Sequence, residues 1–504
     1  MSARFAKSWQ TVGRKIFKPL SEFVFEKSKN LGEKRLVLND PQSLSYPALF
    51  EKVKRLSAFL QSLKLPRQSM LPILGDNCEF LITAYYAVID AGHICVPIEP
   101  RATPEHLSHI ARTCAPRAVI SLKKYGDKMA AFAESQIITE DFAPDGWNIK
   151  TTSGINAGDI AFVLFTSGSS GLPKGVSLTH ANLVANTQSI LGYLPLQETD
   201  IQELVLPIWY SFGLSILNTI VRTGASLVIN NRFMFPSSVI KDTQEFGVTV
   251  FSGVPSHFQI LMKNTDFLKQ NLPTLHMLTQ AGGRFPAKFA FDLQSAFPAK
   301  KIYLMYGATE ASARLAYLEP SLLLKKPGSI GKAIPGVELV IRNTVGKECG
   351  VDEAGEIWAK GANVMLGYFN DPEATREAIQ DGWLKTGDIA RKDVDGDIFI
   401  LDREKDFIKS GGFQVSSKEI EDALLSDTAI AEAAVVGTPD DVLGEAIKAF
   451  IVLRESSTRT SQEVIRSCMA TLPLYKVPKF VEILEELPKS SSGKVLKKTL
   501  KDLK

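Results

Sequence analysis

Cysteine is scarce in this 504-residue chain, and its copies are odd in number and scattered. The five cysteines are Cys78, Cys95, Cys114, Cys349 and Cys468. No short paired spacing is present that would close a disulfide framework or a zinc site. The pattern therefore argues against a disulfide-stapled domain and predicts a reducing compartment.

Long hydrophobic runs and a strong net charge are also missing. No uninterrupted apolar stretch approaches the roughly 20 residues that a helix needs to span a bilayer, and no apolar region typical of a secretory signal peptide is present. The 58 basic and 55 acidic side chains nearly cancel to a net charge of +3, so no whole-molecule field favours nucleic acid. We therefore expect a cytoplasmic protein that spans no membrane and binds no nucleic acid.

The N-terminal segment is locally basic. Its first 21 residues contain no acid, while Phe5, Trp9, Ile16 and Leu20 recur at near-helical spacing. Three interpretations stay open: a helix docked on its own domain, peripheral membrane contact through residues 1–20, and an organellar presequence. Pro19 interrupts the pattern and weakens all three.

The length and the patterning indicate a globular α/β protein of two or more domains. From about residue 40 to 400, short apolar runs alternate with segments of helical period such as 48–63. The runs 161–165, 225–229 and 247–251 are apolar throughout, which is typical of parallel strands covered by helices on both faces. We therefore predict a large N-terminal domain of mostly parallel sheets with helices.

The last part of the chain has a different character. Residues 328–400 are rich in Gly, Asp and alternating strands, which predicts a β subdomain. The charged stretch 402–406, DREKD, is the candidate hinge between domains over 1–401 and 407–504. The second domain is predicted to be small and α+β. Its expected elements are a hairpin over 407–415, helices over 416–425 and 461–472, and strands over 433–436 and 447–453.

A loop over residues 165–175, FTSGSSGLPKG, has the composition of a phosphate site. Its glycines let the backbone approach a ligand, its hydroxyls donate to phosphate oxygens, and Lys174 supplies a cation. The Walker A spacing is absent, because Pro173 precedes Lys174 and Gly175 follows it. By composition the loop is either a flexible connection or a phosphate site of another kind.

The full string TSGSSGLPKGV, followed by SLTH, resembles the phosphate-loop signature of the adenylate-forming superfamily, which includes acyl-CoA synthetases, luciferases and nonribosomal adenylation domains. Further motifs follow in the family's order and extend the resemblance over nearly all of residues 40–504. These motifs are QAGG at 280–283, YGATE at 306–310, WLKTGD at 383–388 and SSSGK at 490–494. The resemblance implies ATP and Mg²⁺, and a small C-terminal domain that is mobile about the hinge.

The resemblance also implies a role for each motif. The implied nucleotide-binding residues are Thr166, Ser167, Gly168, Ser169, Ser170, Gly171, Lys174, Gly282, Gly283, Tyr306, Gly307, Asp388 and Arg403. Among them, Tyr306 is expected to stack on adenine and Asp388 to accept from the ribose hydroxyls. Thr309 would donate to the α-phosphate, and Glu310 would bind Mg²⁺. Lys494 would bridge the carboxylate and the α-phosphate during adenylation.

The remaining implied roles belong to the hinge and the C-terminal domain. Lys405 is the expected pivot, and Asp402 departs from the family, in which glycine is common at that position. Lys409 is a further catalytic candidate. The loop at Gly411 and Gly412 would face the thiol during thioester formation, because glycine permits close approach.

The segment 207–215, PIWYSFGLS, resembles the family's acyl-pocket segment, and Tyr210 stands where many relatives have histidine. Tyr210, Ser211 and Phe212 are the implied pocket residues. They supply no negative charge that would pair with the ammonium group of an amino acid. We therefore expect the substrate to be a small-molecule carboxylic acid that is fatty or otherwise apolar.

The thiol acceptor must come from outside the chain. No carrier-protein motif follows residue 494, and no G-x-S-x-G elbow is present. Coenzyme A is the expected acceptor, and a separate acyl carrier protein is the alternative. A catalytically silent nucleotide-binding scaffold is the hypothesis from another class, and the intact Thr309, Glu310, Asp388 and Lys494 argue against it. The leading prediction is an AMP-forming acid–thiol ligase.

Overall fold

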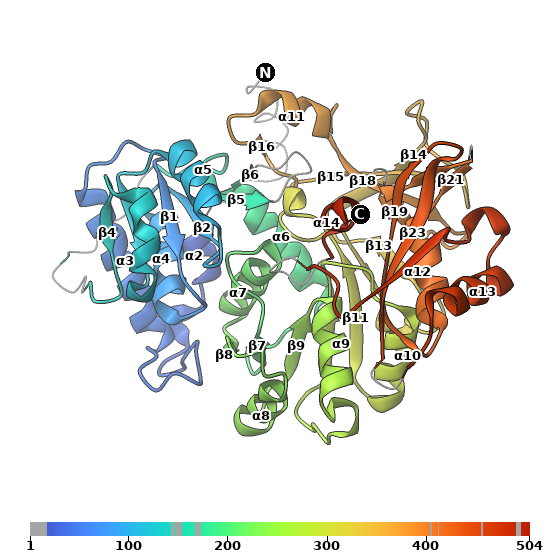
Figure 1. The fold of residues 1–504 in the computed structure, drawn as a ribbon. Coiled ribbons are helices and arrows are strands. Elements are labelled where there is room, and N and C mark those ends of the chain that lie inside the picture. Colours follow the sequence, from blue (N-terminus) through green and yellow to red (C-terminus); the bar gives the residue numbers. More distant parts are fainter. Residues whose placement is uncertain are drawn as a thin grey trace.

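The strands in the described part of the chain form three sheets, which occupy different parts of the ribbon (Figure 1). The computed structural model describes residues 18–142, 147, 154–166, 173–403, 406–411, 413–454, 457–489 and 495–503. Two large sheets precede residue 404, and a smaller one follows residue 407. This arrangement confirms the predicted α/β class with a large N-terminal part and a smaller C-terminal domain.

The first sheet has the order β16-β6-β5-β2-β1-β3-β4. Its strands β1 to β5 run parallel, whereas β6 and β16 are antiparallel at one edge. The first two strands are buried along their whole length, as expected when helices cover both faces. The elements are β1 Met70–Leu74, β2 Ile94–Ile98, β3 Ala118–Ser121, β4 Gln136–Ile138, β5 Ile160–Thr166, β6 Lys174–Thr179, β16 Gly367–Tyr368, α3 Tyr46–Ser62, α4 Glu79–Asp90 and α5 Pro104–Cys114.

The second sheet begins as a parallel α/β unit and continues antiparallel. Strands β7 to β11 are parallel, and β12 turns back along β11. The predicted strand over 247–251 was placed too early, because Gly247 ends a helix with φ +66° and the strand starts at Val250. The elements are β7 Ile201–Leu204, β8 Ser226–Ile229, β9 Val250–Gly253, β10 Met277–Gln280, β11 Lys301–Tyr306, β12 Ala316–Leu318, α6 His180–Tyr193, α7 Ser211–Thr223, α8 Ser237–Phe246, α9 Pro255–Asn264 and α10 Ala287–Ala296.

The β-rich region predicted over 328–400 is present, but it is continuous with the second sheet. β13 pairs with β12 on one side and with β19 on the other, so hydrogen bonds run through the whole array. The short helix α11 lies above β16 (Figure 1). The elements are β13 Ser329–Ala333, β14 Val337–Arg342, β15 Gly355–Gly361, α11 Pro372–Ala378, β17 Ile379–Gln380, β18 Trp383–Lys392 and β19 Ile398–Arg403.

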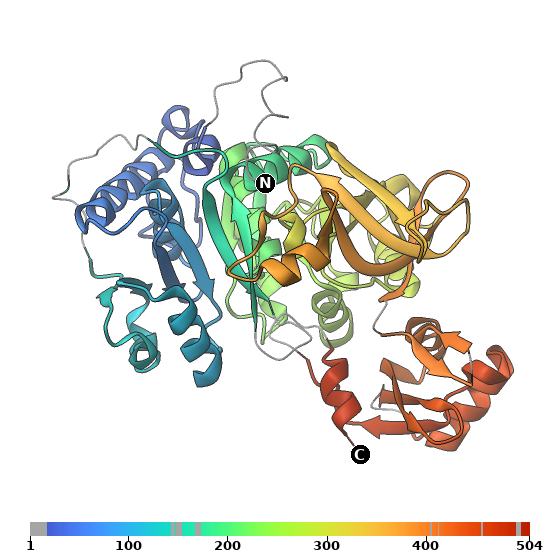
Figure 2. The same ribbon diagram turned by 90° about the horizontal axis from the view of Figure 1, so that it is seen from above.

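The C-terminal domain forms a separate lobe (Figure 2). The predicted hairpin over 407–415 is confirmed by antiparallel pairing of β20 with β21. The strand predicted over 433–436 is longer, because it pairs along its full length with β23 in an extended antiparallel ladder. The elements are β20 Ile408–Ser410, β21 Phe413–Val415, α12 Ser417–Ser426, β22 Ile430–Asp440, β23 Gly444–Leu453, α13 Ser461–Thr471, β24 Phe480–Leu484 and α14 Lys497–Asp502.

Helices α4 and α7 pack in the hydrophobic core between the two large sheets. Nearly every residue of both helices is buried. The Tyr86 hydroxyl donates to Asn218 Oδ1 at 2.9 Å between them, and the Tyr46 hydroxyl donates to the Ala225 carbonyl oxygen at 2.6 Å. Buried hydrogen bonds of this kind fix the register of two apolar layers. The start of α7, which contains three predicted pocket residues, is therefore rigidly placed.

Most of the basic N-terminal segment lies outside the described residues. The description begins at Lys18, and helix α2, Leu20–Val24, starts directly after Pro19. Pro19 therefore begins a helix where the sequence analysis expected an interruption, because proline is compatible with a helix start. Leu20 is fully buried, and its backbone N–H donates to His180 Nδ1 at 3.1 Å. Among the described helices, none is long and apolar enough to cross a membrane.

We expect His180 to make the folded state sensitive to acid. Burial lowers the pKa of this imidazole to about 4 from an ordinary value of 6.5. Between pH 6.5 and 4 this histidine is therefore protonated in the unfolded chain but neutral in the folded chain. As a result, the free energy of unfolding decreases as the pH drops through this range. The cost is about 2 kcal/mol at pH 5. Urea unfolding at pH 7.5 and pH 5 measures it, and His180→Gln should reduce the difference between the two pH values by that amount. An unchanged difference in the variant would refute the assignment.

Candidate active site

Asp388, Tyr306 and Arg403 form one cluster where β11, β18 and β19 meet. The Tyr306 hydroxyl donates to Asp388 Oδ2 at 2.5 Å, and Arg403 Nε lies 3.0 Å from Asp388 Oδ1. Asp388 and Arg403 are opposite each other on antiparallel strands. Burial, reinforced by the Asp388 carboxylate, holds the pKa of Tyr306 well above 10, and Asp388 raises the pKa of Arg403. The Asp388 carboxylate therefore binds two groups, the neutral hydroxyl of Tyr306 and the cationic guanidinium of Arg403.

The backbone before Asp388 is shaped to present this carboxylate. Gly387 takes a left-handed conformation with φ +71°, and its N–H donates to Glu356 Oε1 at 3.0 Å. The Asp388 N–H donates to Thr386 Oγ1 at 3.2 Å. The pairing of β18 with β19 also shifts register just beyond, between Ile389 and Ala390. Irregularities of this kind often re-aim a side chain next to a functional site.

Thr309 and Glu310 lie in a single helical turn, Thr309–Ala311, directly after β11. Thr309 Oγ1 is 3.1 Å from Ser211 Oγ at the start of α7. Glu310 Oε1 accepts from the Tyr368 hydroxyl at 3.0 Å, and Glu310 Oε2 has no partner among the described residues. A carboxylate with one free oxygen fits Mg²⁺, which usually takes one or two protein carboxylates beside phosphate and water.

Gly307 allows this turn to form. A Cβ atom at Gly307 would lie 1.9 Å from the carbonyl oxygen of Ala313, which no side chain permits. The sequence analysis assigned Gly307 to the nucleotide site. In the structure its backbone packs against Ala313 and Arg314, which follow the turn, so any larger residue would force the backbone on one side of the turn to shift.

The predicted phosphate loop joins two antiparallel strands. Thr166 at the end of β5 and Lys174 at the start of β6 are cross-strand partners. The loop residues Ser167, Gly168, Ser169, Ser170 and Gly171 lie outside the described residues. A strand–loop–strand connection differs from the strand–loop–helix of a Walker A site, in agreement with the missing Walker spacing.

Tyr368 connects the base of this loop to Glu310, and sequence analysis missed it. Lys174 Nζ lies 5.2 Å from the centroid of the Tyr368 ring and 3.9 Å from Asp371 Oδ2. The hydroxyl of the same ring binds Glu310. Tyr368 stands on the short edge strand β16, about 200 residues beyond the loop. No local spacing relates Tyr368 to Lys174. The sequence showed only an aromatic residue in a loop-rich segment, which does not by itself indicate a contact with Lys174 or Glu310.

Tyr210 and Gly282 lie together beside this site. The Tyr210 hydroxyl is 3.8 Å from the position that a Cβ atom would take at Gly282. Gly282 has φ +84°, and the Gln280 side-chain amide donates to the Gly283 carbonyl oxygen at 2.8 Å. Burial raises the pKa of the Tyr210 hydroxyl, so it stays neutral. The QAGG turn and the residue that precedes α7 are therefore neighbours on one side of the candidate site.

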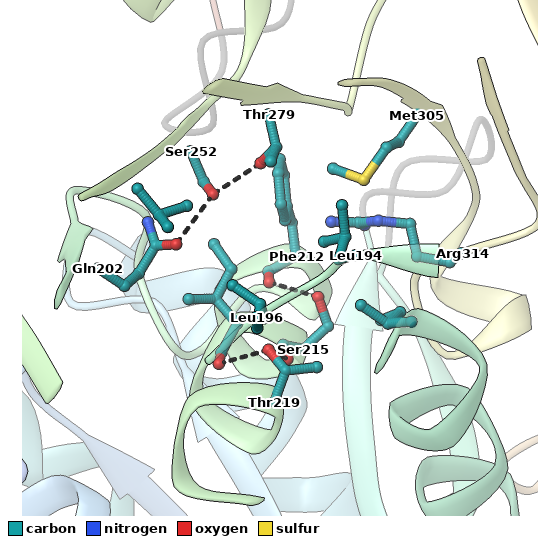
Figure 3. Close-up of a pocket in the computed structure, with 13 residues that line it drawn as sticks. Leu194, Leu196, Gln202, Phe212, Ser215, Thr219, Ser252, Thr279, Met305 and Arg314 are labelled. Carbon is teal, nitrogen blue, oxygen red and sulfur yellow. Dashed lines mark hydrogen bonds between the residues drawn. The ribbon is translucent and has the colours of Figure 1, made fainter. Parts of the chain in front are cut away.

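A buried cavity lies between α6, α7 and the second sheet (Figure 3). It is lined by α7 residues including Phe212 and Ser215, by strand residues of the sheet, and by Met305 and Arg314. Its free volume is about 20 Å³. Phe212, a predicted acyl-pocket residue, is therefore shared between the site and the cavity.

The C-terminal domain contacts the segment after Gly283, where Arg284 pairs with Asp422, but the residues predicted for it do not reach the site in the described part of the chain. Lys409 is exposed, its N–H donates to Glu445 Oε2 at 2.7 Å, and the Gly411 N–H donates to the Leu443 carbonyl oxygen at 2.9 Å. Neither residue touches the clusters around Asp388 and Glu310 in the described part of the chain. Lys405, Gly412 and Lys494 lie outside it.

Asp402, which departs from the family pattern, anchors the C-terminal domain. Its Oδ2 accepts from the hydroxyls of Ser416 and Ser417 at 3.0 and 2.9 Å and from the Lys418 N–H at 3.1 Å. A carboxylate at the first turn of a helix is stabilised by the free N–H groups there. The side chain therefore ties the end of β19 to the start of α12.

Known families and proteins match this chain over most of its length. The AMP-binding enzyme family matches residues 24–369, and the AMP-binding enzyme C-terminal domain matches residues 419–494. A long-chain-fatty-acid CoA ligase of Yersinia pestis is 31% identical over 92% of this chain and 91% of its own. A feruloyl-CoA synthase of Amycolatopsis is 30% identical over 90% of this chain and 93% of its own.

Solved structures agree in fold. The o-succinylbenzoate CoA synthetase of Bacillus subtilis, in complex with its acyl-adenylate intermediate, has a TM-score of 0.87 at 27% identity. That comparison covers 97% of this chain and 99% of the other. The same enzyme with ATP and a magnesium ion has a TM-score of 0.86 at 27% identity, over 96% of this chain and 100% of the other.

The two-lobed α/β fold, with Asp388, Glu310 and Lys174 brought near one another from separate motifs, and the matches to the two AMP-binding families define an ATP-dependent ligase of the adenylate-forming class. The chain belongs to the AMP-binding enzyme family. It is an AMP-forming acyl-CoA ligase. Enzymes of this kind use ATP, Mg²⁺ and coenzyme A to convert a carboxylic acid into its thioester.

Proposed function

We propose that this chain activates an acid with an apolar chain or ring as acyl-AMP and transfers the acyl group to coenzyme A. The convergence of Glu310, Tyr368 and Lys174 carries the proposal, because it puts a candidate Mg²⁺ ligand beside the base of the phosphate loop. In the first step a carboxylate oxygen bonds to the α-phosphorus and pyrophosphate leaves. In the second step the thiolate sulfur bonds to the carbonyl carbon and AMP leaves.

The residue roles follow from the charges in these steps. ATP and a carboxylate repel each other, so cations and hydrogen-bond donors must be held between them. Lys174 and the hydroxyls of the 166–171 loop would receive the phosphates, with Thr309 at the α-phosphate, and Glu310 would hold Mg²⁺. Bound Mg²⁺ supplies positive charge to the phosphate oxygens. Lys494 would lie between the two anions during attack.

The cluster around Asp388 would hold the nucleoside. Both Asp388 oxygens are engaged, one by Tyr306 and one by Arg403, and each carboxylate oxygen can accept a second bond. The ribose hydroxyls would use this remaining capacity. The rings of Tyr306 and Tyr210 and the flat Gly282–Gly283 turn would bound the adenine.

The apolar character of the acid is supported by Phe212 and by the lack of any acidic side chain at Tyr210, Ser211 and Phe212. The relatives named above for long-chain fatty acids and for feruloyl-CoA fit this chemistry. Tyr210, with its hydroxyl near Gly282, would contact the carboxylate end of the acid.

Thioester formation would use the C-terminal domain. We propose domains over residues 1–401 and 407–504, with a hinge over 402–406 and Lys405 as the pivot. Rotation would bring Lys409 and the Gly411–Gly412 loop toward the cleft. The bonds that Asp402 makes to α12 would stay intact during this rotation, because Asp402 would move with α12.

The test is pyrophosphate release from ATP and Mg²⁺ with fatty, aromatic and dicarboxylic acids of graded length, each assayed with and without coenzyme A. Release that yields acyl-CoA is the expected result. Acyl-AMP that accumulates unchanged with coenzyme A, and is discharged onto an acyl carrier protein, would replace the proposed acceptor. Absence of release from every acid would contradict the proposal.

A further inference from the structure

Arg314 is the feature of the cavity in Figure 3 that the proposed function does not use. Its guanidinium group reaches into the cavity toward Phe212. Only 3% of the residue is exposed, and its Cζ lies 4.1 Å from the centroid of the Phe212 ring. Arginine is almost never this buried without an anionic partner.

The positive charge of Arg314 has no anionic counterpart among the described residues. Its terminal nitrogen donates to the Ala313 carbonyl oxygen at 3.1 Å, and Nε has no acceptor. The Tyr193 hydroxyl is a neutral hydrogen-bond partner of the guanidinium, and Tyr210 lies near it without such a bond. Both are neutral, since burial raises the pKa of Tyr193 to about 12 and also raises that of Tyr210. An uncompensated buried cation is costly, so a missing acceptor is indicated.

The other polar side chains of the cavity already have partners. Ser252 and Thr279 share a hydrogen bond of 2.7 Å, and the Gln202 amide donates to a backbone carbonyl oxygen at 2.7 Å. Ser215 and Thr219 donate to carbonyl oxygens of their own helix at 2.7 and 3.0 Å. The donor of the cavity that lacks a partner among the described residues is therefore an N–H group of Arg314. Because this donor belongs to a cation, it favours an anionic oxygen as its acceptor.

The backbone that carries Arg314 is held in an unusual conformation. Ser312 and Ala313 have φ values of +56° and +113°, which are rare for residues with a side chain. The buried Asn363 amide clamps the turn by donating to the carbonyl oxygens of Ala311 and Arg314 at 3.1 and 2.7 Å. Backbone strain of this kind persists where the surroundings impose it, often at a ligand site.

The cavity adjoins the acyl side of the active site. Ser211 contacts Thr309, and the next residue, Phe212, lies under the guanidinium of Arg314. The free volume of about 20 Å³ accommodates roughly one or two water-sized groups. It therefore suits the oxygen atoms at the end of a substrate better than a long alkyl tail.

We propose that Arg314 receives a second anionic oxygen group, a carboxylate, at the far end of the acid that the enzyme activates. The preferred acids are thus dicarboxylic, with an apolar middle against Phe212 and one carboxylate at each end. Arg314 is a specificity-determining residue in this scheme. The inference rests on the proposed function, because the near carboxylate must enter as the group that is adenylated.

Binding of matched acylsulfamoyl adenosines tests the inference without requiring turnover. These stable mimics of acyl-AMP are made from succinic, adipic and suberic acids and from butyric, hexanoic and octanoic acids, and their Kd is measured by calorimetry. We expect a diacid mimic to bind about 10- to 100-fold more tightly than the monoacid mimic of equal length. Arg314→Met should abolish or reverse that preference, and Arg314→Lys should retain part of it.

Arg391→Met is the matched control, because it removes the same charge from a surface pair with Asp352. It should keep the wild-type preference. Thermal melting checks the fold, and Arg314→Met should melt no lower than the wild type if the cation is unpaired in the free enzyme. A large loss of melting temperature would instead assign Arg314 a structural role and overturn the inference.

The outcomes separate this inference from the proposed function. Wild-type protein that binds monoacid and diacid mimics equally, or prefers the monoacid, overturns the inference alone, whatever the variants do. Protein that binds none of the mimics overturns the proposed adenylate site and the inference with it. If Arg314→Met still prefers the diacid mimic, another residue binds the second carboxylate, and the role inferred for Arg314 is overturned.

Discussion

Lys494→Ala is expected to lower the rate of acyl-AMP formation on the order of a hundred- to a thousand-fold, which is typical of removing one pre-positioned electrostatic group. The reason is the repulsion between a carboxylate and the α-phosphate, which Lys494 would offset by lying between them. The second half-reaction has no such pair of anions, so transfer from supplied acyl-AMP to coenzyme A should change little. Acid-dependent exchange of pyrophosphate into ATP measures the first step, and thioester release from synthetic acyl-AMP measures the second.

Lys501→Ala is the control for Lys494→Ala, because it removes an exposed lysine from the same C-terminal segment. Its two half-reactions should both stay near the parental rate. A Lys494→Ala variant that forms acyl-AMP at the parental rate would refute the role. An equal loss in both half-reactions would indicate a structural defect, because the proposed role belongs to adenylation alone.

Asp388→Asn is expected to raise the KM for ATP by about 100-fold, since hydrogen bonds to charged groups contribute about 1.5–3 kcal/mol each. The variant keeps the shape of the side chain but removes the charge that pairs with Arg403. It also replaces one of the oxygens that accept from Tyr306 and, in the proposal, from the ribose. Initial rates at varied ATP concentration and calorimetric binding of AMP both measure the effect.

Tyr306→Phe is the matched variant for Asp388→Asn. It removes one neutral donor to Asp388 and leaves the carboxylate and Arg403 paired, so the rise in KM should be about tenfold or less. Thermal melting separates binding from folding, because Asp388 is buried and pairs two strands. Unchanged ATP and AMP binding, together with a lower melting temperature, would limit Asp388 to a structural role.

Much of the fold was accessible from local pattern. Parallel strands buried on both faces are apolar throughout, so β5 and β8 were visible as runs of apolar letters. The hairpin over 407–415 was visible because Gly411 supplies the left-handed turn that it needs, with φ +58°. Element boundaries were less accessible. β22 exceeds its predicted length because a partner strand, and not its own letters, sets how far pairing continues.

The candidate site divides in the same way. Motifs with several fixed positions led directly to Glu310, Asp388 and Lys174. The expected role of each follows from its residue type, a carboxylate or a cation, and from the motif around it. Tyr368 was missed because its meaning comes from two partners that are about 60 and 190 residues away. Arg314 was missed for a related reason, since a single arginine after YGATE carries no sign that it is buried and unpaired.

The sequence by itself determined the α/β class, the order of the motifs and the kinds of chemical group available for adenylation, because these depend on residue type and short-range spacing. The tertiary structure alone decided which groups meet. It brought Arg403 and Tyr306 onto the two oxygens of Asp388, placed Tyr368 between Lys174 and Glu310, and left Arg314 in a cavity without an anion. Packing of distant segments sets these distances, and burial sets the energetic cost of each unpaired charge.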